Sequence, residues 1–397
     1  MNPMLMQLKS TICSEIVGTL DFGRELTEEE IFDGIDDVLV KHPERRQLSV
    51  DELLKLRTEI FFSLKRFDVL QEYLDDEEVT EIMINGKDHI FVERHGHLYE
   101  TGKCFESVEK LEDIIQQMVA GCNRSVNEAS PIADARLPGG ERVNIVLAPV
   151  ALNGPIVTIR RFPKEPITMQ RLISMGSVTD EAAAFLKQLV LAKYNIMISG
   201  GTGSGKTTFL NALSQFIPSD ERIITIEDSA ELQLLGADNL VRLETRTANS
   251  DNCKEITIRD LIRSALRMRP ERVIVGEVRG EEALDMLQAM NTGHDGSLST
   301  GHANSAKDML KRLETMVLCA ADFPLSAIRG QIAGGVDIIV HLGRVRDKSR
   351  KVLEISEVVG MESGEIVLSK LFEYDGVELK KVNELIHQNK LIRNLEV

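Results

Sequence analysis

The residues with the clearest chemistry lie in one segment, Gly200-Gly-Thr-Gly-Ser-Gly-Lys206-Thr207. It fits the pattern G-x-x-x-x-G-K-[ST], with an apolar strand pattern before it and a helical pattern after it. Glycines let backbone N–H groups curl round an anion, and the helix amino end adds its positive dipole. The segment therefore predicts a nucleotide phosphate cradle, with Lys206 at the β- and γ-phosphates and the Thr207 hydroxyl on Mg²⁺. The residues predicted to contact the nucleotide are Gly201, Thr202, Gly203, Ser204, Gly205, Lys206, Thr207 and Thr208.

Two further segments place acidic side chains at the ends of predicted buried strands. Arg272-Val-Ile-Val-Gly-Glu277 ends in a carboxylate, as a Walker B strand does, and we expect Glu277 to act on Mg²⁺ through water. The strand that begins at Ile223 releases three acids, Glu227, Asp228 and Glu231, into a loop. Ligands of doubly wound sheets bind beyond the carboxyl ends of strands, so both clusters should lie beside the cradle. Hydrolysis needs one carboxylate to orient water and another for the Mg²⁺ shell.

A histidine follows a third short strand, which glycines and hydroxyl residues flank. His302 at the end of that strand would donate to the γ-phosphate or report its loss. A purely structural role is equally open from the residues alone. His294 precedes the strand and is expected to lie away from the nucleotide.

Helical patterns occupy the first part of the chain. Thr27 with Glu30 and Ser49 with Glu52 form capping boxes ahead of apolar residues at helical spacing. They predict a short helical N-terminal module over residues 1–72.

The remaining chain divides into four stretches. Short strands around one helix, expected over about Val108–Ala120, predict an α+β N-terminal domain over residues 73–162. The proline and glycine content of 163–177 predicts an interdomain linker. Helices alternate with short Val- and Ile-rich strands over 178–345, which predicts a mostly parallel sheet with helices on both faces. Residues 346–397 return to strand-like alternation and predict a strand and helix extension.

Composition excludes several classes of protein. The 397 residues carry a formal charge of −16, which disfavours binding of nucleic acid over the whole surface, so no nucleic-acid partner is expected. The 5 cysteines include no C-x-x-C pair, so neither a zinc knuckle nor a disulfide framework is predicted. No signal sequence or membrane span is visible, so we expect a cytoplasmic protein that meets any membrane only through partners.

Taken together, these segments resemble those of type II/type IV secretion ATPases, and the resemblance spans roughly Leu74–Gly360. It is carried by the Walker A segment, an acidic box, a Walker B segment and a histidine box: Gly200–Thr207, Thr225–Glu231, Leu266–Gly280 and Gly293–Ser305. Leu243–Arg246 and Met286–His294 look most like the CpaF branch, which powers tight-adherence (Flp) pili. The resemblance implies a homo-hexameric ring with a RecA-like P-loop NTPase domain, ATP and Mg²⁺ as ligands, and platform proteins of the inner membrane as partners.

The resemblance also implies roles for single residues. Glu231 is similar to the general base that polarises water, Glu277 to the Walker B glutamate and His302 to the box histidine, beside Lys206 and Thr207 of the P-loop. The family brings arginines of the N-terminal domain to the phosphates, and a guanidinium fork suits phosphate oxygens. The matching candidates are Arg160 first, then Arg142 and Arg161, with surface ion pairs as the alternative for each.

Departures from the family narrow the subfamily. The four-cysteine zinc module of the type II secretion and pilus extension enzymes is missing, and the helical N-terminus is longer than in compact DNA-transfer relatives. The turn Arg346-Asp-Lys-Ser-Arg350 departs from the expected Asp-Gly-Ser-Arg. We therefore expect a motor ATPase that powers assembly or retraction of a pilus by movement about the linker. The alternatives are a conjugation-type traffic ATPase of a type IV secretion system and a nucleotide-binding scaffold without turnover.

Overall fold

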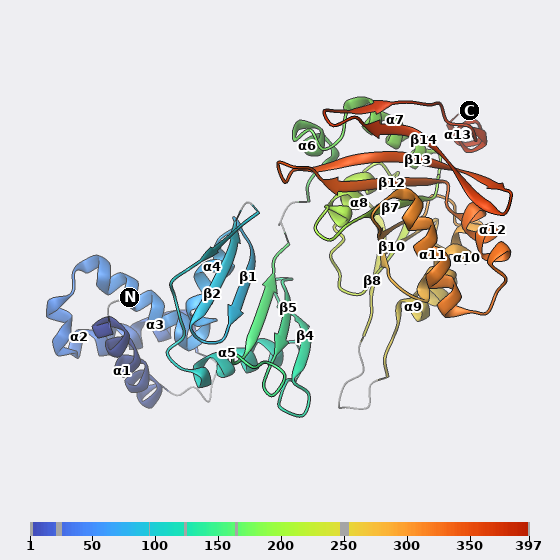
Figure 1. Cartoon of the computed structure of the whole chain (residues 1–397). Coiled ribbons are helices and arrows are strands. Elements are labelled where there is room, and N and C mark those ends of the chain that lie inside the picture. The colour runs from blue at the N-terminus through green and yellow to red at the C-terminus, as the bar shows by residue number, and fades with distance from the viewer. Residues whose placement is uncertain are drawn as a thin grey trace. The chain divides into compact units, whose positions relative to one another are not determined.

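A computed structural model describes residues 3–20, 26–94, 96–122, 125–162, 166–246 and 254–395. The chain forms two compact units, Met1–Pro163 and Lys164–Val397 (Figure 1). The finer domain boundaries drawn from the sequence, at residues 72 and 345, stay predictions. Residues 163–165 of the predicted linker and Cys253 lie outside the described residues.

The first unit begins with helices whose amino ends follow the predicted capping boxes. Both predicted capping boxes, Thr27–Glu30 and Ser49–Glu52, are formed. Thr27 Oγ1 accepts the Glu30 N–H at 3.2 Å, and Ser49 Oγ accepts the Glu52 N–H at 3.3 Å. The apolar faces of the three long helices pack into one core, because each helix has apolar residues at helical spacing. The helical elements are α1 (Pro3–Thr19), α2 (Glu28–Lys41), η1 (Pro43–Gln47), α3 (Val50–Lys65), η2 (Asp68–Leu70) and α4 (Gln71–Asp75).

The rest of the first unit is a six-stranded antiparallel sheet with the strand order β3-β2-β1-β6-β5-β4. One helix shares a core with it, and that helix has the bounds predicted from the sequence. Strand β4 was not predicted. The elements are β1 (Val79–Asn85), β2 (His89–Arg94), β3 (His97–Glu100), α5 (Val108–Ala120), β4 (Ile132–Arg136), β5 (Arg142–Val146) and β6 (Ile156–Arg160).

The second unit is built on a nine-stranded sheet in the order β15-β14-β13-β12-β7-β11-β10-β8-β9. The six strands from β12 to β9 are parallel, and the three at the other edge are antiparallel. One core contains residues of α7 and α8, and a second contains residues of α9 to α12, so helices cover both faces (Figure 1). The predicted α/β fold, a mostly parallel sheet with helices on both faces, is therefore confirmed.

The elements of this unit follow in chain order. They are α6 (Met169–Ser174), α7 (Asp180–Leu191), β7 (Ile196–Gly200), α8 (Lys206–Ser214), β8 (Arg222–Glu227), β9 (Asn239–Glu244), α9 (Ile258–Ala265), β10 (Arg272–Val278), α10 (Glu282–Asn291), β11 (Leu298–His302), α11 (Ala306–Ala320), α12 (Leu325–Gly335), β12 (Ile338–Arg344), β13 (Arg350–Glu362), β14 (Glu365–Tyr374), β15 (Leu379–Lys381) and α13 (Asn389–Leu395). Among these and the helices of the first unit, as far as the chain is described, none is long and apolar enough to cross a membrane.

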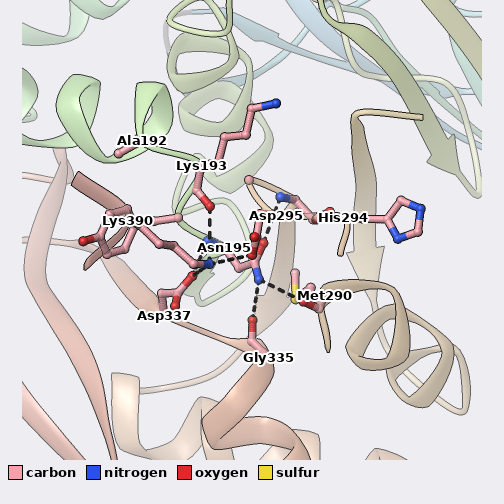
Figure 2. Close-up of polar contacts among 12 residues, drawn as sticks. Ala192, Lys193, Asn195, Met290, His294, Asp295, Gly335, Asp337 and Lys390 are labelled. Carbon is pink, nitrogen blue, oxygen red and sulfur yellow. Dashed lines mark hydrogen bonds and ion pairs between the residues drawn. The ribbon is translucent and has the colours of Figure 1, made fainter. Parts of the chain in front are cut away.

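A buried polar network fixes the start of β7, the strand that carries the phosphate loop. Asn195 Nδ2 donates to the Gly335 carbonyl at 2.8 Å, and Asn195 Oδ1 accepts the Ser297 N–H at 3.0 Å. Figure 2 shows Lys390 of α13 reaching the same place, where its Nζ lies 2.7 Å from Asp337 Oδ2. Because buried polar groups need partners, this network ties the segments before β7, β11 and β12 together. It sets the position of the loop at the opposite end of β7.

Candidate active site

The loop between β7 and α8 is shaped for close approach of an anion. Gly203 and Gly205 have φ values of 68° and 93°, a region that favours glycine. A Cβ at Gly200 would lie 2.5 Å from Ser204 Oγ and 2.6 Å from the Leu342 carbonyl oxygen, whereas a Cβ at Gly201 would meet nothing within 4 Å. The loop is therefore closed against the sheet and open on its outer side.

The amino end of α8 has unsatisfied donors. Its N-cap residue, Gly205, makes no side-chain cap hydrogen bond. The Ser204 hydroxyl is buried and has no hydrogen-bond partner among the described residues. Uncapped N–H groups together with a buried unpaired hydroxyl fit phosphate oxygens, which accept hydrogen bonds and carry negative charge.

Three residues predicted from separate segments meet beside this loop. Lys206 Nζ lies 3.1 Å from His302 Nδ1, and His302 Nε2 lies 2.8 Å from Glu277 Oε1. His302 ends β11, Glu277 lies near the end of β10, and Lys206 begins α8. Parallel strands bring their carboxyl ends to one edge of the sheet, which is why residues so distant in sequence come together.

The surroundings of His302 lower its pKa and favour the neutral ring. Burial lowers the pKa of His302 first of all, the cationic groups of Lys206, Arg279 and Arg312 lower it further, and Glu277 opposes them. Nδ1 of the neutral ring accepts from the Lys206 ammonium, and Nε2 lies 2.8 Å from Glu277 Oε1. His302 therefore links the phosphate loop to the acidic edge of the site.

In the acidic box, the side chain of Glu227 binds the backbone of the loop that carries Glu231. Glu227 ends strand β8, is 3% exposed, and accepts the backbone N–H groups of Glu231 and Leu232 at 2.7 Å and 2.8 Å. Burial raises the pKa of Glu227 to about 7, although both N–H donors lower it. Gly276 on the adjacent strand leaves room for it, since a Cβ there would lie 2.9 Å from Glu227 Cγ. The sequence placed Glu227 in the loop; in the structure it is the strand end on which the loop with Glu231 is anchored.

Arg279 belongs to the same edge and was not among the predicted site residues. Its Nε donates to Glu277 Oε2 at 2.8 Å, and its Nη1 lies 3.7 Å from Asp228 Oδ2. Desolvation lowers the pKa of Arg279, but the carboxylates of Glu277, Asp228 and Glu231 outweigh it and the pKa is raised. The sequence signal was its position two residues after Glu277, which places both side chains on one side of an extended chain.

A cavity of about 660 Å³ opens beside the loop. One wall is formed by the loop and the end of β11, and the other by the first turns of α11, which carry basic and polar side chains. The lining residues are Gly201, Thr202, His302, Ala303, Asn304, Asp308, Lys311, Arg312 and Thr315. The cavity is open on the side where the outer face of Gly201 leaves free space.

The predicted arginines lie in the first unit. Arg136, Arg142 and Arg160 are direct register partners across β4, β5 and β6, so three guanidinium groups follow one another across the sheet. Arg142 Nε lies 3.5 Å from Asp134 Oδ1, and Arg160 is exposed.

Like charges placed directly opposite each other destabilise a sheet, and this row therefore suits an anion. Arg161 differs from the row, because its Nη1 donates to the backbone carbonyls of Tyr73, Asp76 and Val79. The roles of all three predicted arginines stay predictions.

Most of the chain matches a known protein family. Residues 64–379 match the family described as "Type II/IV secretion system protein". A Methanocaldococcus jannaschii protein, MJ0781, is 41% identical over 276 residues, which cover 68% of this chain. This chain spans 38% of the length of that archaeal relative.

Two further similarities concern named proteins. The probable conjugal transfer protein TrbB of Sinorhizobium fredii is 36% identical over 302 residues, covering 75% of this chain and 88% of that protein. The structure of the Legionella pneumophila ATPase DotB aligns with a TM-score of 0.53 and 21% identity, over 74% of this chain and 80% of that one. At this identity the similarity to DotB concerns the fold.

Proposed function

The chain belongs to the type II/IV secretion system protein family, and on that premise we propose that it is a Mg²⁺-dependent ATPase, the motor of a pilus or secretion machine. The observation that carries the proposal is the convergence of Lys206, His302 and Glu277 at the uncapped amino end of α8. A phosphate-binding loop alone binds nucleotide. A loop beside two carboxylate-bearing strand ends can also activate water.

Each residue has a defined part in this proposal. Lys206 binds the β- and γ-phosphates, and His302 contacts the γ-phosphate once Lys206 turns to the nucleotide. Glu231 orients and polarises the attacking water, while Glu227 holds the backbone of Glu231 in place.

The residues at the acidic edge also fit Mg²⁺. Arg279 donates to Glu277 Oε2, whereas Glu277 Oε1 is buried and has no hydrogen-bond partner among the described residues, so one carboxylate oxygen is left for a water of the Mg²⁺ shell. Thr207 and Glu277 would hold Mg²⁺, the glutamate through water, and the ion would neutralise charge on the phosphates.

The arginines of the first unit carry a further part of the proposal. Arg142 and Arg160 are exposed or half-buried on strands of a unit separate from the one that carries the loop. A guanidinium brought to the γ-phosphate stabilises charge in the transition state. We infer a homo-hexameric ring in which hydrolysis moves the two units about residues 163–177.

The machine we propose is a tight-adherence pilus of the CpaF type. Residues 1–63 precede the family match and contain α1 and α2, so the chain has a helical module in addition to the shared core. The sequence has no four-cysteine zinc module, in keeping with this branch. The motor would lie in the cytoplasm and act on platform proteins of the inner membrane, and its net charge of −16 disfavours nucleic acid as a partner.

A conjugation-type traffic ATPase is a second candidate function. The relative TrbB is described as a probable conjugal transfer protein, and 75% of this chain aligns with it. The two candidates share the chemistry of the site and differ in the partner.

Phosphate release tests the common core of both candidates. The purified chain with saturating MgATP should release phosphate, and light scattering should find a hexamer. If the ring binds ATP but releases no phosphate, the protein is a nucleotide-binding scaffold without turnover and the ATPase proposal is wrong. Co-purification with pilus platform proteins supports the first candidate, and co-purification with DNA-transfer components supports the second.

A further inference from the structure

The hairpin that joins β12 to β13 closes although its sequence departs from the family turn. The Val345 N–H donates to the Ser349 carbonyl at 3.0 Å, and the Ser349 N–H donates to Asp347 Oδ1 at 2.8 Å. Lys348 has a φ of 65° and takes the left-handed position that the family turn gives to glycine. The hairpin therefore presents its first and last residues at a defined place.

Those residues are two arginines that converge on the phosphate loop. Arg344 and Arg350 are direct register partners, and the Nε of each donates to the Gly203 carbonyl at 3.0 Å. Arg344 Nη2 lies 2.7 Å from the position that a Cβ on Gly203 would occupy. Both guanidinium groups thus lie against one peptide of the loop.

This arrangement is costly without an anion. Like charges directly opposite each other across antiparallel strands repel, and here both also share one acceptor. Both side chains are exposed, and Arg344 makes no ion pair with any residue of the described part of the chain. An anionic group beside Gly203 would offset this repulsion and could accept hydrogen bonds from the guanidinium of Arg344.

The order of strands says which part of a nucleotide lies there. Strand β7 pairs with β11 on one side and with β12 on the other. His302, at the end of β11, marks the γ-phosphate side of the loop in the proposed function. The hairpin after β12 lies on the opposite side of β7, and in the proposed function this is the side away from the γ-phosphate.

We propose that Arg344 and Arg350 bind the α-phosphate end of the nucleotide, while their Nε groups hold the loop through the Gly203 carbonyl. The proposal rests on the proposed function, because it takes the bound anion to be ATP or ADP. The pair sets affinity and leaves the chemical step to the other side of the loop. ADP and ATP present the same α-phosphate, so both should depend on the pair equally.

The test compares Arg344→Gln and Arg350→Gln with Arg346→Gln, which removes an equal charge from an exposed residue of the same turn. Glutamine keeps an N–H donor for the carbonyl but no charge. Each of the first two substitutions should raise the Kd of a fluorescent ADP analogue about tenfold and raise the KM for ATP by the same factor. The kcat should fall less than about twofold. Arg346→Gln should bind as the wild type does.

Two further readouts separate a phosphate contact from a clamp on the loop. The difference between wild type and variants should shrink with added salt, because exposed charges are screened. Competition by inorganic tripolyphosphate should weaken by the same factor as ADP. The contact with the α-phosphate would be ruled out if the variants lost affinity only for ligands that contain adenosine. It would also be ruled out if the loss of affinity did not change with salt.

Failure of this inference is distinct from failure of the proposed function. If the wild type releases phosphate and the Arg344 and Arg350 variants bind like Arg346→Gln, the inference is wrong and the ATPase stands. If the wild type binds ADP more tightly than both variants but releases no phosphate, the contact stands and the ATPase is wrong.

Discussion

The two flanks of the phosphate loop carry opposite kinds of side chain. On the flank of β11, β10 and β8, the carboxylates of Glu277 and Asp228 lie close to His302 and Arg279. On the flank of β12 and β13, Arg344 and Arg350 meet a loop carbonyl. The first flank can orient water and exchange a proton, whereas the second can only hold an anion. On the proposed function, one cradle would thereby separate turnover from affinity.

A second comparison concerns the two sets of facing arginines. Arg142 and Arg160 face each other in the first unit with Asp134 and Glu81 nearby, since Glu81 is the next register partner of Arg160. Arg344 and Arg350 face each other against the phosphate loop itself. The first set therefore has carboxylates close by, whereas the second set lies against a backbone carbonyl of the loop.

The largest effect is expected from Lys206→Ala, because Lys206 contacts both the flank with His302 and the phosphate loop itself. Its ammonium contacts His302 on one side and the Gly201 carbonyl of the loop on the other. Phosphate release should fall on the order of 10³-fold, and binding of the ADP analogue should weaken in the same preparation. Retention of wild-type affinity would show that Lys206 acts on the hydrolytic flank alone.

The pH dependence of stability probes the buried anchor of that flank. Folding raises the pKa of Glu227 from 4.5 to about 7, so the folded state favours the protonated carboxyl. Its contribution to stability is present below the ordinary pKa and is lost as the pH rises through the folded value. Relative to Glu227→Gln, the wild type should lose up to about 3 kcal/mol of unfolding free energy between about pH 4.5 and pH 7.

Thermal unfolding of both proteins across this range measures the difference. The constant offset from burying an amide cancels, because only the change with pH is compared. A parallel pH profile for wild type and Glu227→Gln would mean that Glu227 is charged throughout.

The smallest effect separates Glu227 as an anchor from Glu227 as a catalyst. Glu227→Ala removes the acceptor of the Glu231 and Leu232 N–H groups, and kcat should fall about tenfold because Glu231 is displaced. Glu227→Gln keeps an oxygen acceptor and should restore most of kcat. Binding of ADP should not change, since the arginine flank is intact. Equal loss in both variants would assign Glu227 to the chemistry itself.

Much of the fold follows from sequence patterns. A strand was predicted and is found at Arg272–Val278, because a short run of apolar residues is typical of a buried strand. A helix was predicted and is found at Val108–Ala120, because its apolar residues recur with a period of 3.6 residues. Helix α11 was missed although Ser305 caps it and Met309, Leu313 and Val317 are buried at helical spacing. Strand β4 is only five residues long and was missed because so short an alternation is a weak signal.

Some residues of the candidate site could be predicted from the sequence, and others could not. Lys206, Glu277 and His302 stand at strand or helix ends, so the rule for parallel sheets brings them together. Arg344 lies 141 residues from Gly203, and only the register of β12 against β7 and β13 places it there. Glu227 looked like a loop acid because the last residue of a strand cannot be told from the first residue of a loop by composition.

The most direct test of the account is steady-state phosphate release by Glu231→Gln at saturating MgATP, with the Kd of the ADP analogue measured on the same ring. The account predicts that release falls on the order of 10²-fold or more while the Kd changes less than about threefold. The two flanks then act separately, one on turnover and the other on affinity. Phosphate release at the wild-type rate by Glu231→Gln, or a loss that only follows a weaker Kd, would contradict it.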